Sequence, residues 1–291
     1  MLVKNYPELN GHSVGILLKE LVRRAIMVVR QQTTIFEVSQ KVGYDGNMND
    51  VFTTADRLAQ QVYVKSLQEC FPDVGIIGEE DSLMIPSAKG VDAYFTIDPI
   101  DGTKAYIRRQ SHGVGSMIAF VVSDAVVSAY IGDINTREIF GYRPDSAHVW
   151  RITDMEVFEA LDSNPPEVDI YTLQILMRDR DQDYGELSQR TVNFFRGLSI
   201  DSGSIGIWAA RLWKKEVGAL VLRAAWETPW DSNPVIGISQ KLGYTFLRPT
   251  VEGLWGEYPL IPFREKEWRE HDMLIIHRNQ LPSLARHGLF A

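Results

Sequence analysis

Residues 93–107 place the tightest constraint on how this chain folds. The segment begins with a short apolar run, residues 93–97, of the kind that forms a buried strand. Asp98 follows the run, and Pro99 comes directly after it. Because proline cannot donate a ladder hydrogen bond, we expect the chain to leave the sheet at Pro99. The pattern therefore predicts a buried strand that ends in a carboxylate.

A second carboxylate and a turn follow this strand. Asp101 precedes Gly102, which permits a close backbone approach to a ligand, and Thr103 is suited to the start of a helix. Neighbouring carboxylates repel each other unless a cation lies between them, and oxygen ligands without Cys or His favour Mg2+. The N–H groups at a helix start bind anions, most often phosphate. The segment predicts metal-assisted phosphoryl chemistry, with a plain Asp-Gly turn as the alternative from this pattern alone.

Several other motifs are excluded. An EF-hand loop begun at Asp98 would need Gly at its sixth position and Glu at its twelfth, but these are Thr103 and Arg109. The sequence contains no Walker A, HExxH or GxSxG motif. Gly113-Val-Gly115 is not followed by the third glycine of a dinucleotide-binding loop, so that type of site is not predicted either.

The composition is that of an ordinary folded protein. The 291 residues suffice for one large domain or two packed lobes, and 45% are apolar and 23% charged. A net charge of -8 gives no overall reason to expect binding to a nucleic-acid polymer or a membrane. The single cysteine, Cys70, excludes an internal disulfide, and its spacing from Leu67 predicts a core position. We see no secretory signal and no apolar run of membrane-spanning length, so the cytoplasm is the expected compartment.

The first half predicts two helices and a meander of strands. Apolar residues recur at helical spacing over residues 13–31 and again after Asp56. Thr54 is expected to cap the second helix, with Asp56 in its first turn near the positive end of the helix dipole. Asp56 therefore has a structural explanation, whereas Asp50 has none. Strands are expected at residues 74–77, 114–122, 125–131 and 138–142.

The second half alternates strand and helix patterns, which is typical of layered α/β structure. A polar, proline-containing stretch at residues 151–166 separates the halves and predicts an N-terminal lobe of residues 1–155 and a C-terminal lobe of residues 156–291. Strands are expected at residues 169–177, 198–200, 219–222 and 273–277. Helices are expected at residues 184–195, at residues 204–216, and from Trp230-Asp231 to Gly243.

Three motifs taken together resemble those of the inositol monophosphatase superfamily. They are Gly78-Glu79-Glu80, Asp98-Pro-Ile-Asp-Gly-Thr103 and Trp230-Asp231, in that order. The resemblance implies an αβαβα layered sandwich, an α/β fold of two lobes with mixed sheets. It also implies a typically lithium-sensitive phosphatase that requires two or three Mg2+ ions, acts on a small-molecule phosphomonoester and forms a homodimer. The acidic run at Glu79, which alone is typical of a solvated loop, then becomes part of the site.

Carried over position by position, the resemblance implies particular roles for the site residues. The metal ligands would be Glu79, Asp98, the main-chain carbonyl of Ile100, Asp101 and Asp231. Glu79 would also hold the attacking water, and the pair that activates this water would be Thr103 and Asp50, because Asp50-Val-Phe-Thr-Thr-Ala-Asp56 matches the family's Asp-x-x-Thr-x-x-Asp. The N–H groups of Gly102 and Thr103 would hold the phosphate. Glu80, the second acid of the Gly78-Glu79-Glu80 motif, is a weaker candidate for a site residue than Glu79.

The C-terminal half departs from the family pattern, which leaves the substrate open. Gly203-Ser204 matches a motif near the substrate, but Ala224 aligns with the sugar-contacting Glu of inositol phosphatases, and Ser232-Asn-Pro-Val follows Trp-Asp in place of small residues. Lys104 is more usual in relatives that act on adenosine bisphosphates or histidinol phosphate. We therefore predict that inositol phosphate is not the best substrate and that a nucleotide or another phosphomonoester is hydrolysed more efficiently. A 3'(2'),5'-bisphosphate nucleotidase and a non-catalytic member that binds metal and anions are the alternatives.

Overall fold

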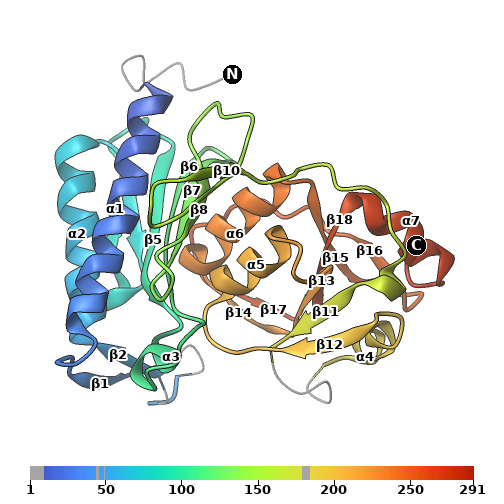
Figure 1. Cartoon of the computed structure of the whole chain (residues 1–291). Helices are drawn as coiled ribbons and strands as arrows, with labels where there is room; N and C mark the ends of the chain where they lie inside the picture. The colour runs from blue at the N-terminus through green and yellow to red at the C-terminus, as the bar shows by residue number, and fades with distance from the viewer. Residues whose placement is uncertain (1–9, 44–45, 49, 179–183) are drawn as a thin grey trace.

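The computed structural model describes residues 10–43, 46–48, 50–178 and 184–291, which form five layers (Figure 1). Helices α1 and α2 cover one face of an eight-stranded sheet, and α5 and α6 lie between that sheet and a six-stranded one. Helices α4 and α7 lie on the far side of the six-stranded sheet. The predicted αβαβα sandwich with mixed sheets is confirmed.

The eight-stranded sheet carries the acidic motifs. Its order is β10-β9-β8-β7-β6-β5-β3-β4. All its neighbours are antiparallel except β3 and β5, which run parallel, so the residues that follow these two strands meet at one edge. The strands are β3 Gly75–Gly78, β4 Met84–Ile85, β5 Ala93–Asp101, β6 Gly115–Val122, β7 Ala125–Asp133, β8 Ile139–Tyr142, β9 Trp150–Ile152 and β10 Phe158–Ala160.

Strand β5 does not end where Pro99 predicted. It continues to Asp101, and its pairing with β6 shifts register between Asp98 and Asp101. The missing N–H of Pro99 is tolerated because the ladder is already interrupted there. The prediction that the strand ends at Asp98 was therefore wrong, and both carboxylates belong to the strand itself.

Two amphipathic helices cover the outer face of this sheet. They are α1 Gly11–Gln32, close to its predicted bounds, and α2 Thr54–Cys70. Thr53 and not Thr54 caps α2, in a capping box whose third helical residue is Asp56. Cys70 is exposed, so its predicted core position was wrong: it is the last residue of α2 and faces away from the sheet.

The second sheet has the order β12-β11-β13-β18-β15-β16. Its strands are β11 Gln174–Met177, β12 Gly197–Ile200, β13 Ala219–Leu222, β15 Tyr244–Pro249, β16 Trp255–Glu257 and β18 Met273–His277. The helices are α4 Glu186–Val192, α5 Ile205–Trp213, α6 Pro229–Lys241 and α7 Leu281–Arg286. The first part of the strand predicted at residues 169–177 is instead a 3-10 turn, Ile170–Thr172.

Short elements complete the molecule around the functional site. Two-stranded ribbons are formed by β1 Val38–Lys41 with β2 Asp50–Thr53, and by β14 Ala225–Glu227 with β17 Glu267–Arg269. Helix α3, Thr103–Ile107, follows β5. The first sheet extends to β10, beyond residue 155, and the division into lobes of residues 1–155 and 156–291 stays a prediction. Within the described ranges, no helix combines the length and apolar character that a membrane crossing requires.

Candidate metal and phosphate site

A cavity of about 430 Å3 opens where the two halves of the chain meet. Its walls come from the ends of β3 and β5, the start of α3, the loop before α5 and the first turn of α6. The predicted site residues that line it are Asp50, Glu79, Asp98, Ile100, Asp101, Gly102, Thr103, Lys104, Gly203 and Asp231. Ser204, the remaining predicted residue, lies directly behind Asp101.

Three carboxylates form the centre of this cavity. One oxygen each from Asp98, Asp101 and Asp231 lies within 4.8 Å of the others. The Asp98 and Asp101 side chains are only 2% and 8% exposed. Asp101 Oδ2 accepts hydrogen bonds from Ser204 Oγ and, at 3.0 Å, from Gly206 N at the start of α5. Two halves of the chain that are distant in sequence thus contribute to one acidic cluster.

Asp231 is positioned by the first turn of α6. Pro229 begins the helix, where its missing N–H costs nothing, and Asp231 lies in the first turn. Thr228 Oγ1 donates to Asp231 Oδ2 at 2.6 Å, which fixes the carboxylate toward the cavity. Sequence reasoning found Asp231 through the Trp-Asp pair, and the structure brings it beside the β5 carboxylates.

Burial and mutual repulsion raise the pKa values of these acids. Desolvation, with the charges of Glu79, Asp231 and Asp101, raises the pKa of Asp98 well above its ordinary value. Desolvation and the charge of Asp231 raise the pKa of Asp101 to about 7. The Oδ1 atom of Asp98 is buried without a hydrogen-bond partner among the described residues. An oxygen-rich cluster with an unpartnered buried carboxylate oxygen fits a divalent cation such as Mg2+.

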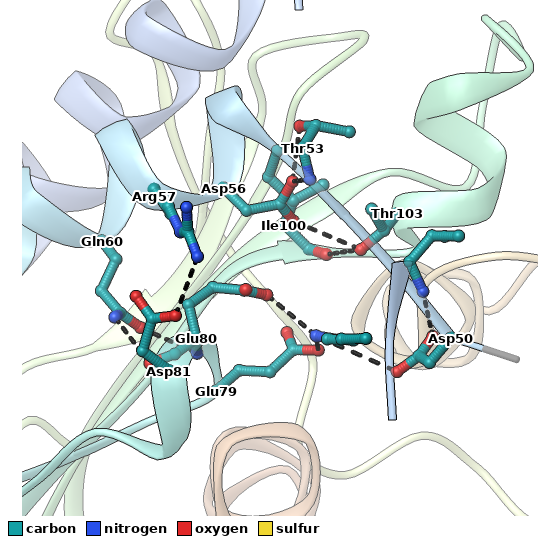
Figure 2. A network of polar contacts seen from close by, with 12 residues as sticks. Asp50, Thr53, Asp56, Arg57, Gln60, Glu79, Glu80, Asp81, Ile100 and Thr103 are labelled. Carbon is teal, nitrogen blue, oxygen red and sulfur yellow. Dashed lines mark hydrogen bonds and ion pairs between the residues drawn. The ribbon is translucent and has the colours of Figure 1, made fainter. Parts of the chain in front are cut away.

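Glu79 and Glu80 follow β3 and share one cation. The Nζ atom of Lys41, on β1, lies 2.8 Å from Glu79 Oε1 and 3.0 Å from Glu80 Oε1. Asp50 Oδ2 lies 3.9 Å from the same nitrogen (Figure 2). Desolvation raises the pKa of Glu79 to about 8 even though Lys41 lowers it. Sequence analysis missed Lys41, because no local pattern in β1 indicates its distant carboxylate partners.

Thr103 is bonded to Asp56 and not to Asp50. Its Oγ1 donates at 3.0 Å to Ile100 O and lies 3.3 Å from Asp56 Oδ1 (Figure 2). Asp56 is fully buried, and its Oδ2 accepts from Thr53 N at 2.7 Å and from Thr53 Oγ1 at 2.5 Å. The predicted partner, Asp50, instead accepts from Val51 N. The structure thus brings Thr103 to Asp56, and the water-activating role of Asp50 stays a prediction.

The geometry of the Asp-x-x-Thr-x-x-Asp segment explains why Asp56 and not Asp50 lies beside Thr103. Asp50 is on β2, and its carboxylate oxygens lie 3.9 Å and 4.0 Å from the Nζ atoms of Lys41 and Lys104. Asp56, one turn into α2, faces the start of α3. The explanation of Asp56 as a helix-start residue was right, but it was incomplete, because one carboxylate oxygen serves the cap and the other serves Thr103.

Close backbone contact joins the starts of α3 and α5. Gly102 has φ 89°, and a Cβ there would lie 2.4 Å from Gly113 O and 2.9 Å from Ser204 N. Gly203 has φ 102°, and a Cβ there would lie 2.2 Å from the same carbonyl. Ser204 N donates to Gly113 O at 2.8 Å. Only glycine permits this approach, which brings the first N–H groups of both helices to the cavity.

Basic side chains line the outer part of the cavity. They include Lys104, which is 58% exposed, Arg108 and Arg178. The Arg178 guanidinium lies 5.5 Å from the Trp208 ring centroid. Although Ala224 occupies the position that aligns with the sugar-contacting Glu, Glu227 also lines the cavity. That carboxylate is already bound, because Arg269 Nε donates to Glu227 Oε1 at 3.0 Å.

Comparison with known proteins identifies a family and several relatives with similar sequences. The inositol monophosphatase family model matches residues 12–280. The Nus factor SuhB of Pseudomonas aeruginosa is 34% identical over 95 residues, 33% of this chain and 30% of that protein. The histidinol-phosphatase of Chlorobaculum parvum is 28% identical over 197 residues, 66% of this chain and 70% of that protein. The match to SuhB thus spans under a third of its length.

A solved structure shares the fold over nearly the whole chain. The crystal structure of an IMPase/NADP phosphatase complexed with Mg2+ and phosphate superposes with a TM-score of 0.72 and 15% sequence identity. The superposition covers 95% of this chain and 95% of that one. At this identity the similarity establishes the fold alone.

Proposed function

Because the chain belongs to the inositol monophosphatase family, we propose that it is a Mg2+-dependent hydrolase of a small phosphomonoester. The observation that carries the proposal is the buried cluster of Asp98, Asp101 and Asp231, whose oxygens lie within 4.8 Å of one another. Three desolvated carboxylates at this separation need a cation, and their oxygens are the ligands that Mg2+ prefers. Glu79 and the Ile100 carbonyl would complete the ligand set at the same cavity.

Bound Mg2+ would supply Lewis-acid stabilisation of the phosphoryl oxygens and lower the pKa of the attacking water. Asp98, Asp101 and Asp231 would hold one ion, with Glu79 and Ile100 O at a second. Two or three ions fit the number of oxygens offered. Lys41 now bonds Glu79 and would have to release this carboxylate for it to reach a cation.

Thr103 and Asp56 would orient the attacking water. The Thr103 hydroxyl would donate its one hydrogen to Asp56 in place of Ile100 O, and a lone pair of its oxygen would accept a hydrogen bond from the water. Asp56 acts through Thr103 and is therefore a positioning residue, while Thr103 and Glu79 would contact the water directly. Asp50 would remain a wall residue between Lys41 and Lys104.

The phosphate would be held between the metal ligands and the start of α3. Gly102 and Thr103 line the cavity, Gly102 has a left-handed conformation, and their N–H groups would be the donors to the phosphate. Gly203 and Ser204 fix this turn from the opposite side. Preorganised N–H donors stabilise charge on a transferring phosphoryl group without a reorganisation cost.

The leaving group would carry a further negative charge. Lys104, Arg108 and Arg178 line the outer cavity, and Arg269 neutralises its carboxylate, Glu227. A second phosphate would find planar donors there, which supports a 3'(2'),5'-bisphosphate nucleotidase as the second candidate function. A polyol without further charge would lose these contacts, so we expect inositol phosphate not to be the best substrate.

A phosphate-release assay tests the proposal. Purified protein would be given inositol 1-phosphate, histidinol phosphate, glycerol 2-phosphate and adenosine 3',5'-bisphosphate, each with Mg2+ and with EDTA. We expect Mg2+-dependent release, fastest for the bisphosphate. No release from any compound, together with retained Mg2+ binding, would support the non-catalytic alternative. Homodimer formation and lithium inhibition stay predictions, tested by light scattering and by LiCl titration.

A further inference from the structure

A second cavity of about 560 Å3 lies behind α3. Its walls come from the end of α1, from α3 with the turn after it, and from the loop after β7, through residues that include Arg30, Tyr106, Arg109, Gln110 and Asn135. In Figure 1, the lower end of α1 and α3 lie at the same end of the molecule. The volume falls within the range of small-molecule sites.

The charge of this cavity is one-sided. Arg30 and Arg109 line it, and none of its lining residues is acidic. Arg30 Nη1 donates to two neutral carbonyls, Ile134 O at 2.8 Å and Asn135 O at 3.1 Å. Over the described part of the chain, no ion pair joins Arg30 or Arg109 to a carboxylate within 4 Å. In a protein with a net charge of -8, two arginines without acidic partners at one cavity indicate an anion site.

Two buried polar atoms of the cavity residues also have no partner. Gln110 Oε1 and Asn135 Oδ1 are both buried, and neither makes a hydrogen bond within the described residues. Asn135 Nδ2 donates to Gln110 O at 3.2 Å, which fixes how this amide is turned. A buried acceptor without a donor is unfavourable, so a ligand hydroxyl that donated to it would be stabilised.

We propose that this second cavity is a binding site for a small hydroxylated anion, a sugar acid or a sugar phosphate. Arg30 and Arg109 would bind the carboxylate or phosphate, and the oxygens of Gln110 and Asn135 would accept from its hydroxyl groups. The proposal does not depend on the hydrolytic activity of the first cavity, since it concerns different side chains and requires only binding.

The site shares a wall with the first cavity. Thr103 and Lys104 line the first cavity, Tyr106 and Arg109 line the second, and Gln110 lines both. Helix α3 is thus the wall between them. The turn after it is held by hydrogen bonds from Arg108 N to Lys104 O, from Arg109 N to Tyr106 O and from Gln110 N to Ala105 O. A ligand that binds Gln110 and Arg109 would thus contact the wall that the two cavities share.

Two adjacent arginines provide a matched test. Arg108 lines the first cavity and Arg109 the second, so Arg108→Gln and Arg109→Gln remove the same charge from neighbouring positions. Binding of gluconate would be followed by NMR through the side-chain amide signals of Gln110 and Asn135, at constant ionic strength. Sulfate and glycerol serve as an anion without hydroxyls and a polyol without charge. Arg109→Lys tests whether charge alone rescues binding, and thermal unfolding confirms that each variant is folded.

We expect gluconate to shift both amide signals saturably and more tightly than sulfate or glycerol. Arg109→Gln should weaken binding by about tenfold or more, because a charge-assisted hydrogen bond is lost, while Arg109→Lys retains most of the affinity and Arg108→Gln changes it by less than about twofold. No saturable shift with gluconate would overturn the proposal. Equal losses in Arg108→Gln and Arg109→Gln would also overturn it, as would equal binding of sulfate or of glycerol.

Discussion

Replacing Asp56 by Asn tests the water-orienting arrangement most directly. The amide oxygen can keep the hydrogen bonds from Thr53 N and Oγ1 that Asp56 Oδ2 now accepts. The amide nitrogen then replaces Oδ1, 3.3 Å from Thr103 Oγ1. Two donors would face each other, so the Thr103 hydroxyl must accept from the amide and can donate only to Ile100 O. The amide would occupy one lone pair of the hydroxyl oxygen, and the hydroxyl could no longer pass a proton toward residue 56.

Asp56→Asn should greatly lower kcat but should raise the free energy of unfolding. Loss of a positioned proton-transfer group lowers kcat by ~100-fold to ~10,000-fold. Burial raises the pKa of Asp56 from 3.8 to about 7, which corresponds to about 4 kcal/mol. Since the folded state binds the proton more tightly, stability falls as pH rises through the window from 3.8 to about 7. Asp56→Asn removes this fall and should be more stable than the wild type at pH 8.

The assay is kcat at saturating Mg2+ with glycerol 2-phosphate, together with urea unfolding in EDTA at pH 5 and pH 8. Asp50→Asn is the matched control, because it makes the same substitution in the same segment at a carboxylate that does not bond Thr103. We expect Asp50→Asn to lower kcat far less than Asp56→Asn. The reasoning is refuted if Asp50→Asn loses as much kcat, or if Asp56→Asn is no more stable than the wild type at pH 8.

Three further predictions concern the metal, the hydroxyl and the leaving group. Asp101→Asn should abolish Mg2+-dependent turnover and reduce the Mg2+-induced rise in Tm. The variant should keep the fold, because the amide oxygen still accepts a hydrogen bond from Gly206 N. Near-wild-type turnover at saturating Mg2+ would contradict this prediction. Thr103→Ala should lower kcat by ~100-fold to ~10,000-fold, and Thr103→Ser should restore it. A change confined to the Mg2+ dependence would instead assign the hydroxyl to metal binding or to helix capping. Arg178→Gln should raise KM by about tenfold for adenosine 3',5'-bisphosphate but not for glycerol 2-phosphate. Equal effects on both substrates would show that Arg178 does not bind the leaving group.

Much of the fold follows from local patterns. The spacing of apolar residues predicted α1, α2 and the meander of β6, β7 and β8, because each buries one regular face against a neighbour. The error at Pro99 arose because a bulge is a property of two paired strands, and sequence reasoning treated β5 alone. Strands β15 and β16 were missed because they pair with β18 and with each other in the second sheet, while the local sequence is aromatic and irregular.

The acids of the central cluster, which stay predicted metal ligands, could be found from the sequence because each lies near a proline. Asp98 and Asp101 flank a proline, and Asp231 follows a proline at a helix start. Lys41 was not predictable, since it lies on a short exposed ribbon and meets Glu79 only through tertiary packing. Both acids of the Asp-x-x-Thr-x-x-Asp segment are aspartates, so the sequence alone could not show which of them bonds Thr103. The structure shows that α2 turns Asp56 toward the start of α3.

The pKa values of the central acids connect the fold of this cavity to its chemistry. Without a cation, desolvation raises the pKa of Asp98, Asp101 and Asp231 together, so ionising them as the pH rises makes the folded state less stable. The folded chain tolerates this because β5, the α5 start and the α6 start are each held by bonds that do not depend on the metal, such as Gly206 N to Asp101. A preformed cluster of this kind would bind an ion without first having to order Asp98, Asp101 and Asp231, whereas Glu79 would first have to leave Lys41. Its affinity should then depend on pH mainly through the protons that Mg2+ must displace.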